Sequence, residues 1–205
     1  MRPVRDRRAT NAVDAAVECH ELTPPMWPAL EALFGDNGAC AGCWCMFWRL
    51  EQGERFDDVK GETAKRRFKK LVTSGAVHGI LAFVGDEAVG WCAFERREEL
   101  LRLDRAPSLR CDDATRVWSL PCFFVKSGFR GRGVAQAMLM SAEAALCRRG
   151  AVIAEGYPVK PSASGRQPAA FVYTGLPSMF ERAGFALAEA RPKGKQRYRK
   201  ALPQK

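Results

Sequence analysis

The sequence predicts a mixed α/β domain, of the α+β kind, on two observations. Two strand-like runs flank the turn Gly85-Asp86-Glu87, which is typical of a β-hairpin. A third strand is followed by a Gly-rich turn, a long amphipathic helix and a fourth strand, which together make a strand–helix–strand unit. The four strands are expected at 79–84, 88–95, 117–125 and 151–158, and the long helix at 134–149.

Shorter elements complete the predicted domain. Helices are expected at 26–34, 62–74 and 177–183, where apolar residues recur at helical spacing or a proline opens the first turn. A last strand is expected near 186–190. Because Pro121 lies inside the third strand and cannot donate a hydrogen bond to a neighbour, we also expect a bulge or an unpaired position there.

The formal net charge of +10 is concentrated at the two ends of the 205-residue chain. Residues 1–8 carry four arginines against Asp6, and residues 191–205 carry seven cations and no acid. Basic tails can hold nucleic acid or acidic proteins by electrostatic attraction. A solvated terminus, or for 191–205 a last strand with charged faces, explains the same pattern and is the interpretation we favour. We therefore do not expect nucleic acid as a partner.

The sequence shows no signal for export or for insertion into a membrane. No apolar run approaches the roughly 18 residues of a membrane helix, and the N-terminal residues do not resemble a secretory signal. We expect a soluble, cytoplasmic protein whose eight cysteines stay reduced. Residues 1–20 are expected to form a flexible basic lead-in and 21–205 a single domain, with a homodimer as an alternative to a monomer.

The strongest local pattern is Arg130-Gly131-Arg132-Gly133-Val134-Ala135 between a strand and the long helix. The first N–H groups of a helix have no internal partner, and the helix dipole places partial positive charge there. Glycines let a phosphate approach the backbone, so this turn is typical of an anion site. It lacks the Gly-Lys-Ser/Thr of a Walker A loop and the G-x-G-x-x-G order of a dinucleotide fingerprint.

The loop instead resembles the Q/R-x-x-G-x-G/A signature of the GNAT acetyltransferase superfamily. The strand ending in Val125 and the aromatic Phe129 just before the signature fit that family as well. Downstream, Phe180-Glu181-Arg182-Ala183-Gly184-Phe185 is similar to the family's Tyr-Glu-Lys-x-Gly-Phe segment. The resemblance covers roughly residues 79–190. It implies the GNAT fold, which is a mixed, mostly antiparallel twisted sheet with helices on both faces.

The same resemblance implies an N-acetyltransferase that uses acetyl-CoA. The expected acceptor is a primary amine of a small molecule or of a protein lysine. In this family the pantetheine arm pairs with the fourth strand and the backbone of the loop holds the pyrophosphate. The implied coenzyme residues are Phe124, Val125, Arg130, Gly131, Arg132, Gly133, Val134 and Ala135. Two alternatives stay open: a coenzyme-binding sensor without turnover, and a nucleic-acid-associated protein that uses its basic tails.

The general base and acid are less clearly indicated by the sequence. A lysine-like amine has a pKa of about 10.4 and must lose a proton before it attacks. The stretch 121–124, where many family members carry a glutamate, has no acid. We expect Glu155 as base, with Glu95 second and removal through water as an alternative.

For the acid, Phe180 stands where the family usually has a tyrosine, and it cannot donate a proton. Tyr173 is our first candidate in its place, followed by Tyr157. Alternatively no acid is needed, because a thiol with a pKa of about 8.5 leaves readily as the thiolate. Phe180 itself is expected to pack against the coenzyme arm or in the core.

The segment 40–48 combines three cysteines with aromatic residues. Cys40, Cys43 and Cys45, with His20 as a fourth ligand, suggest a metal, yet no second Cys-x-x-Cys pair exists, so we expect none. The Cys-Trp-Cys-Met-x-Trp pattern resembles a subset of GNAT-like proteins. In the family this region covers the acceptor pocket, so the implied acceptor residues are Trp44, Trp48 and Arg49, with core packing as the alternative.

Overall fold

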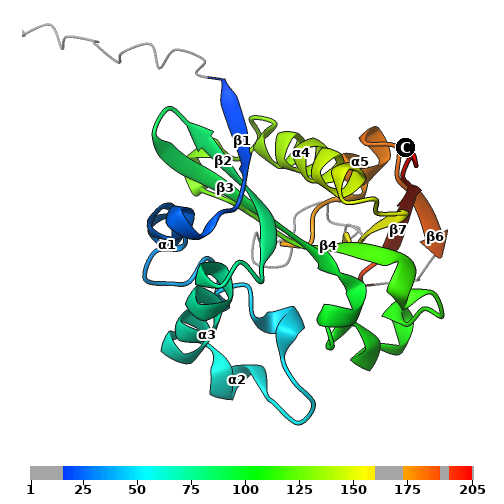
Figure 1. Cartoon of the computed structure of the whole chain (residues 1–205), viewed down its shortest axis with the longest axis horizontal. Helices are drawn as coiled ribbons and strands as arrows, with labels where there is room; N and C mark the ends of the chain where they lie inside the picture. Colours follow the sequence, from blue (N-terminus) through cyan, green and yellow to red (C-terminus); the bar gives the residue numbers. More distant parts are fainter. Residues whose placement is uncertain (1–15, 160–172, 190–193, 205) are drawn as a thin grey trace, which may run out of the picture.

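The computed structural model describes residues 16–159, 173–189 and 194–204, and it is built around one seven-stranded sheet (Figure 1). The strands lie in the order β1-β2-β3-β4-β5-β7-β6, and every neighbouring pair in this sheet is antiparallel except β4 with β5. They comprise β1 Val17–Glu21, β2 His78–Val84, β3 Glu87–Arg96, β4 Val117–Val125, β5 Ile153–Gly156, β6 Ala186–Glu189 and β7 Arg197–Ala201.

The helices are α1 Trp27–Phe34, α2 Phe56–Val59, α3 Glu62–Thr73, α4 Val134–Arg148 and α5 Pro177–Arg182. Short 3₁₀ turns lie at Pro24–Met26, Phe47–Arg49, Arg97–Glu99, Leu103–Arg105, Pro107–Leu109, Ala114–Arg116 and Ser127–Phe129. Over the described ranges, no helix is both long enough and apolar enough to cross a membrane.

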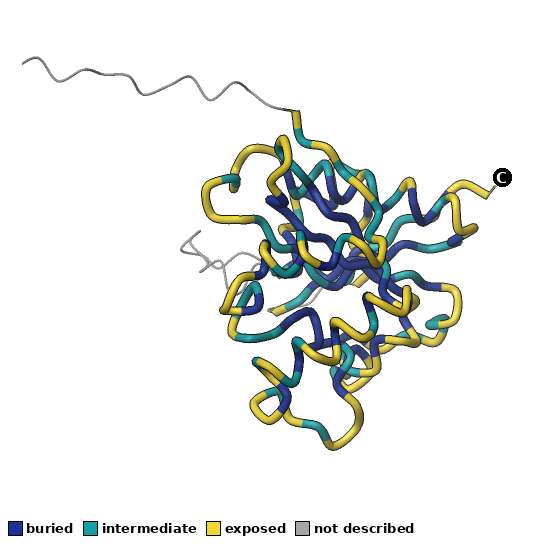
Figure 2. Tube along the Cα trace, turned by 60° about the vertical axis from the view of Figure 1, so that its left-hand side comes forward, coloured by how far each residue is buried: buried dark blue, intermediate teal, exposed yellow. Residues whose placement is uncertain are grey.

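Two apolar layers fill the two faces of the sheet. On one face α4 packs against β1 to β4, and its Met138 and Leu139 are fully buried with Ile80 of β2. On the other face α1 and α3 bury Phe34 and Phe68 against the sheet. Figure 2 shows the buried trace running through the central strands with exposed loops around it. The expected mixed sheet with helices on both faces is therefore confirmed.

The structure has a strand at each end of the described chain. The sequence predicted no strand at the first end, and at the second it left a solvated terminus and a last strand as alternatives. β1 begins at Val17 and pairs with β2 over its whole length, so the last residues of the expected lead-in 1–20 belong to the sheet. Its burial alternates along the strand, because only every second side chain faces the core. The basic C-terminal run forms β7, and its cations pair with acids: Arg199 with Asp113, and Lys200 with Glu143. The interpretation of a last strand with charged faces is confirmed.

The strands β4 and β5 separate halfway along β4. They pair from Val117↔Ile153 to Leu120↔Gly156, where β5 ends, while β4 continues for another five residues to Val125. The predicted bulge lies at the same place. The register with β3 shifts there, so that Leu120 and Pro121 both face a single residue, Phe94. The fold thus leaves a gap beside the second half of β4.

Gly156 at the end of β5 is required by close contact. An added Cβ would lie 2.1 Å from Cε1 of the Phe180 ring, which is fully buried against Phe123 and Phe185. We expect Gly156→Ala to lower the free energy of unfolding by about 1–3 kcal/mol, because a packed ring has to move. Urea denaturation measures the change.

Gly128→Ala is the matched control, because an added Cβ at that position meets no atom within 4 Å. A Gly156→Ala variant as stable as Gly128→Ala would show that the Phe180 ring can move without a loss of stability.

Candidate active site

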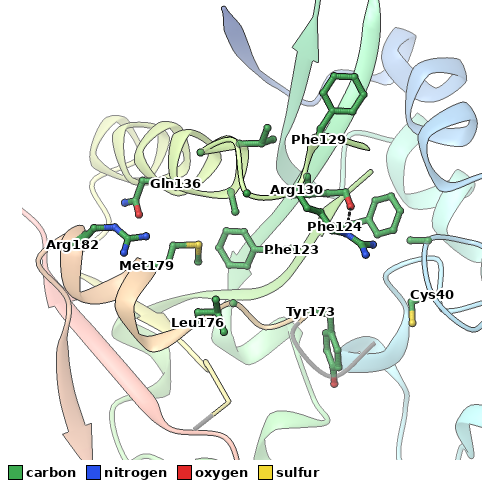
Figure 3. Close-up of a pocket in the computed structure, with 17 residues that line it drawn as sticks. Cys40, Phe123, Phe124, Phe129, Arg130, Gln136, Tyr173, Leu176, Met179 and Arg182 are labelled. Carbon is green, nitrogen blue, oxygen red and sulfur yellow. Dashed lines mark hydrogen bonds between the residues drawn. The ribbon is translucent and has the colours of Figure 1, made fainter. Parts of the chain in front are cut away.

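A cavity of about 550 Å³ lies at the gap beside β4 (Figure 3). The end of β4, the turn before α4 and the segment around α5 form its walls. Of the predicted coenzyme residues, it is lined by Phe124, Val125, Arg130, Gly131, Gly133, Val134 and Ala135. Arg132 does not line it. Its guanidinium lies 5.7 Å from the centre of the Phe129 ring instead.

The start of α4 presents unbonded N–H groups to this cavity. Gly133 caps the helix with a φ of +80°, and its carbonyl accepts the first helical bond, from Ala137 at 3.0 Å. The N–H groups of the three residues between them consequently have no partner inside the helix. Gly131, with a φ of +75°, keeps the turn free of side chains on its approach.

Gln136 adds a polar atom to the same wall. Its side-chain Oε1 is buried and has no hydrogen-bond partner, although the residue lines the cavity. A buried acceptor without a donor costs about 1–3 kcal/mol, so a ligand N–H at this point would be favourable.

The free edge of β4 also points into the gap. Lys126 N donates to Val89 O of β3 at 2.9 Å, and alternate residues of a strand point their backbone groups to opposite sides. The backbone of Val125 and Phe123 therefore faces away from β3. Phe123 N donates to Tyr173 O at 2.6 Å, and Val125 O accepts from Arg130 Nε at 3.0 Å.

The pairing of β4 with β3 changes what is expected of Phe124, one of the implied coenzyme residues. The backbone of Phe124 lies on the side of β3, where it is paired with Trp91, so Phe124 reaches the cavity with its ring rather than its peptide groups. Figure 3 shows that ring beside Arg130. Val125 is the residue whose N–H is directed into the gap.

Tyr173 closes the lower part of the cavity in Figure 3. Its ring lies 6.5 Å from that of Trp48, measured between ring centres. Burial raises the pKa of the Tyr173 phenol, so the hydroxyl keeps its proton at neutral pH. It is the predicted acid that the structure places at the gap.

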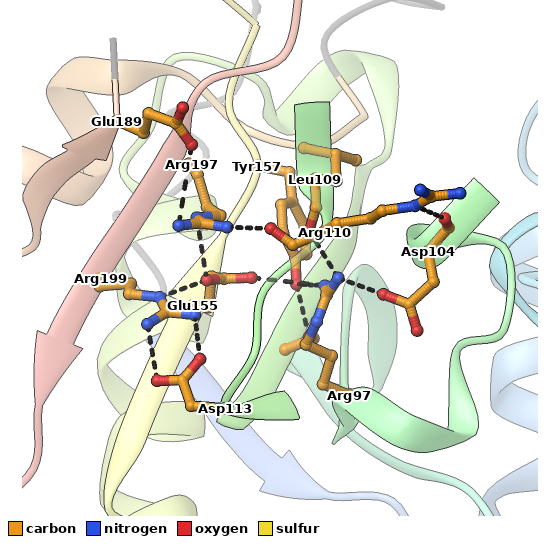
Figure 4. Close-up of polar contacts among 11 residues, drawn as sticks. Arg97, Asp104, Leu109, Arg110, Asp113, Glu155, Tyr157, Glu189, Arg197 and Arg199 are labelled. Atoms are coloured by element: carbon orange, nitrogen blue, oxygen red, sulfur yellow. Dashed lines mark hydrogen bonds and ion pairs between the residues drawn. The ribbon is translucent and has the colours of Figure 1, made fainter. Parts of the chain in front are cut away.

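The first predicted base, Glu155, lies elsewhere (Figure 4). Its side chain is fully buried and does not line the cavity. One oxygen faces Arg97 Nη1 at 3.4 Å, and the other pairs with Arg199 and lies 3.5 Å from Arg197 Nε. The structure therefore places Glu155 among three guanidinium groups and does not bring it to the cavity, where a base would be needed.

The other candidates for proton transfer are also held away from the cavity. Glu95 pairs with His78 at 2.9 Å and Arg49 at 2.7 Å. Burial alone would raise the pKa of Glu95, but these two contacts together lower it. Tyr157 is fully buried, with its hydroxyl 2.6 Å from that of Ser119. The lining residues that the structure describes include no carboxylate and no imidazole.

The expected acceptor residues separate into two groups. Trp44 is buried and stacks on Trp27 with 5.9 Å between ring centres, and Arg49 is committed to Glu95. Both are packing or structural residues here. Trp48 differs, because its Nε1 donates to Pro121 O at 3.1 Å and its ring lines a second cavity of about 390 Å³. Sequence reasoning missed Arg102 and Lys195, which share that cavity, because they lie far apart in the chain.

The cysteine segment packs in the core and does not form a ligand set. In the described part of the chain, no three His, Cys, Asp or Glu side chains gather as metal ligands. Cys45 lies within 3.4 Å of Trp91 Nε1, which donates to its sulfur, and Cys40 lines the cavity beside β4.

The sequence of residues 36–158 matches the family model described as "Acetyltransferase (GNAT) family". That range is more than half of the chain, and the fold agrees, so the protein belongs to the GNAT family of acetyltransferases. The resemblance noted from the loop and from the segment 180–185 is confirmed, as is the expected class of enzyme.

Solved structures of low identity share the fold. An acetyltransferase of the GNAT family from Listeria monocytogenes aligns with a TM-score of 0.56 at 13% identity, covering 91% of this chain and 95% of that one. The PaiA N-acetyltransferase of Thermoplasma acidophilum, in complex with coenzyme A, gives 0.53 at 12%, covering 91% and 99%. The yncA protein of Salmonella typhimurium, with its cofactor acetyl-CoA, gives 0.54 at 10%, covering 92% and 95%. No curated protein matches the sequence.

The enclosure of Glu155 leads to a prediction about stability. Glu155→Ala should lower the free energy of unfolding by about 3–5 kcal/mol, because it leaves the buried Arg97 without its carboxylate partner on β5. Urea unfolding measures this change.

Glu98→Ala serves as the control, since Glu98 forms an exposed pair with Arg96, and we expect a change within about 0.5 kcal/mol. If Glu155→Ala instead kept wild-type stability and lost only catalytic activity, the structural role of Glu155 would be wrong. Its predicted role as the general base would then be supported.

Proposed function

We propose that the cavity beside β4 binds acetyl-CoA and that the protein transfers the acetyl group to a primary amine. The observation that carries this proposal is the joint position of the α4 N-terminus and the free edge of β4 on one cavity. The complexes of the Thermoplasma and Salmonella proteins with coenzyme A and acetyl-CoA support it by similarity of fold.

The residues present fit such a ligand. The unbonded N–H groups at the start of α4, with Arg130 nearby, provide donors and positive charge for a pyrophosphate. Val125 N–H and the buried Gln136 Oε1 supply a donor and an acceptor for an amide-bearing arm. When bound, acetyl-CoA supplies the activated acyl group as a thioester.

For the transfer step, we propose that Tyr173 donates its proton to the departing thiolate of the coenzyme, which leaves as the thiol. Its hydroxyl is protonated at neutral pH, and its ring lies at the gap. Because no carboxylate or imidazole is present among the described lining residues, the amine would lose its proton through water.

The acceptor in this proposal is a primary amine of a small molecule or of a protein lysine. The test is a panel of amines assayed by release of free thiol, with acetyl-CoA binding measured separately by calorimetry. Binding with turnover of at least one amine supports the proposal. Binding without any turnover favours a coenzyme sensor, a function suggested by the absence of a carboxylate among the described cavity residues. No binding would refute both.

Gly133→Asp tests the phosphate loop directly. The substitution places a negative charge at the helix start that is proposed to hold the pyrophosphate, so we expect the Kd for acetyl-CoA to rise at least tenfold. Calorimetry measures the affinity, and circular dichroism checks that the fold persists.

Gly75→Asp is the matched control, because Gly75 also has a positive φ and open space around it but follows α3. Equal affinities of the two variants for acetyl-CoA would show that this loop does not hold the pyrophosphate.

Tyr173→Phe tests the proposed acid. We expect kcat to fall at least tenfold, since a positioned proton donor contributes about 10²–10⁴ in rate, while acetyl-CoA affinity stays within about twofold. Steady-state kinetics and calorimetry separate the two effects. Tyr198→Phe removes a hydroxyl that bonds to Glu181 outside the cavity, and kcat should remain unchanged. A Tyr173→Phe enzyme with wild-type kcat would show that the thiolate leaves unaided.

A further inference from the structure

The second cavity has a strongly positive lining. It holds about 390 Å³ and includes Arg102, Arg105 and Lys195 together with the rings of Phe47 and Trp48. None of the lining residues that the structure describes is acidic. Three cations from two segments far apart in the sequence, 102–105 and Lys195, thus line one cavity.

The carboxylate of Glu54 interacts electrostatically with Arg105, so the two cations without a counter-charge in the described part of the chain are Arg102 and Lys195. Arg105 Nη2 donates to the carbonyl of Leu50 at 2.7 Å, and the Arg102 guanidinium lies 4.2 Å from the centre of the Phe47 ring. Burial and the neighbouring Arg102 both lower the pKa of Lys195. The cavity is consequently a place where a negative group would be stabilised.

This second cavity, called the cationic cavity below, adjoins the cavity beside β4, called the coenzyme cavity below. Aromatic rings lie between the two. Lys195 Nζ lies 5.3 Å from the centre of the Tyr173 ring and 5.5 Å from that of the Trp48 ring. Tyr173 lines the coenzyme cavity, and Trp48 lines the cationic one and bonds to Pro121 on β4, where the strands separate. A molecule in the cationic cavity is therefore next to the point where the acetyl group would be delivered.

We propose that the acceptor is a small amine that also carries an anionic group, a carboxylate or a phosphate, and that this group binds to Lys195 and Arg102. This inference rests on the proposed function, because it assigns the acceptor class of the same site. A cavity of this volume accommodates a small molecule. Polyamines and lysines in basic peptides would bring further positive charge to these cations, so they are disfavoured.

The experiment compares pairs of amines that differ only in the charged group. γ-Aminobutyrate is assayed against γ-aminobutyramide, glycine against glycinamide, and O-phosphoethanolamine against ethanolamine, with spermidine as a cationic acceptor. We expect kcat/KM to be at least tenfold higher for the anionic member of at least one pair. The carboxylate and phosphate pairs show which anion is preferred.

Two variants test the named residues. Lys195→Gln and Arg102→Gln should each reduce the preference for the anionic member at least fivefold while acetyl-CoA affinity stays unchanged. Arg66→Gln is the control, because it removes the same charge from an exposed position on α3 and should leave the preference intact. Having two variants means that a folding defect in one of them leaves the other to decide.

The outcomes separate this inference from the proposed function. Equal or greater turnover of the neutral members or of spermidine would overturn it, even with acetyl-CoA bound and transferred. If no amine is acetylated, calorimetric titration of the same pairs decides, and failure to bind the anionic members more tightly overturns it. Loss of acetyl-CoA binding refutes the proposed function alone, because anion binding to Lys195 and Arg102 is measured without the coenzyme.

Discussion

The position of one aromatic ring determines much of the site. Phe180 is wedged against Gly156 at the end of β5 and Gly175 before α5, where an added Cβ would lie within 3 Å of the ring in both cases. On its other side it packs edge-on against Phe123 of β4, with 5.9 Å between ring centres. The pairing of β4 with β5 ends at Gly156, the residue against which this ring packs. The gap that the coenzyme is proposed to occupy therefore depends on apolar packing.

A buried ionic cluster fixes the paired half of the same strands. Glu155 joins Arg97, Arg197 and Arg199, so that one carboxylate on β5 ties together β7 and the segment that follows β3. Charges buried this deeply are tolerated only when they are fully paired, and removing one partner is costly. The two halves of β4 thus have different surroundings. Before Pro121 the strand is hydrogen-bonded to β5, which carries the ionic cluster. After Pro121 it has no neighbouring strand on that side.

Local patterns predicted most of the fold because their signals are local. Periodicity predicted α3 and α4, the hairpin turn predicted β2 and β3, and Pro121 predicted the bulge. β1 was not predicted because only two of its five residues, Val17 and Cys19, are apolar, in a stretch too short to stand out. The glycine-rich loop at 130–135 could be recognised for the same reason as the helix it opens, since both are contiguous in the sequence.

The surroundings of the predicted base could not be inferred from the sequence, because they depend on long-range contacts. Glu155 was expected to be a base because a carboxylate on a strand beside the gap fits that role. Its true environment is set by Arg97, 58 residues earlier, and Arg199, 44 residues later. Trp48 and Lys195 are likewise brought together from opposite ends of the chain. Their pairing has no sequence signature, whereas the choice of Tyr173 as a candidate was narrow because the chain has only three tyrosines.

The rings that separate the two cavities also matter for inhibition. Lys195 lies against both Tyr173 and Trp48, so the wall between the coenzyme cavity and the cationic cavity is thin. A single compound that joined a coenzyme-like arm to an anionic head by a short linker would engage both cavities at once. Its second contact would then form at the high effective concentration set by the linker, and its affinity would exceed that of either half alone.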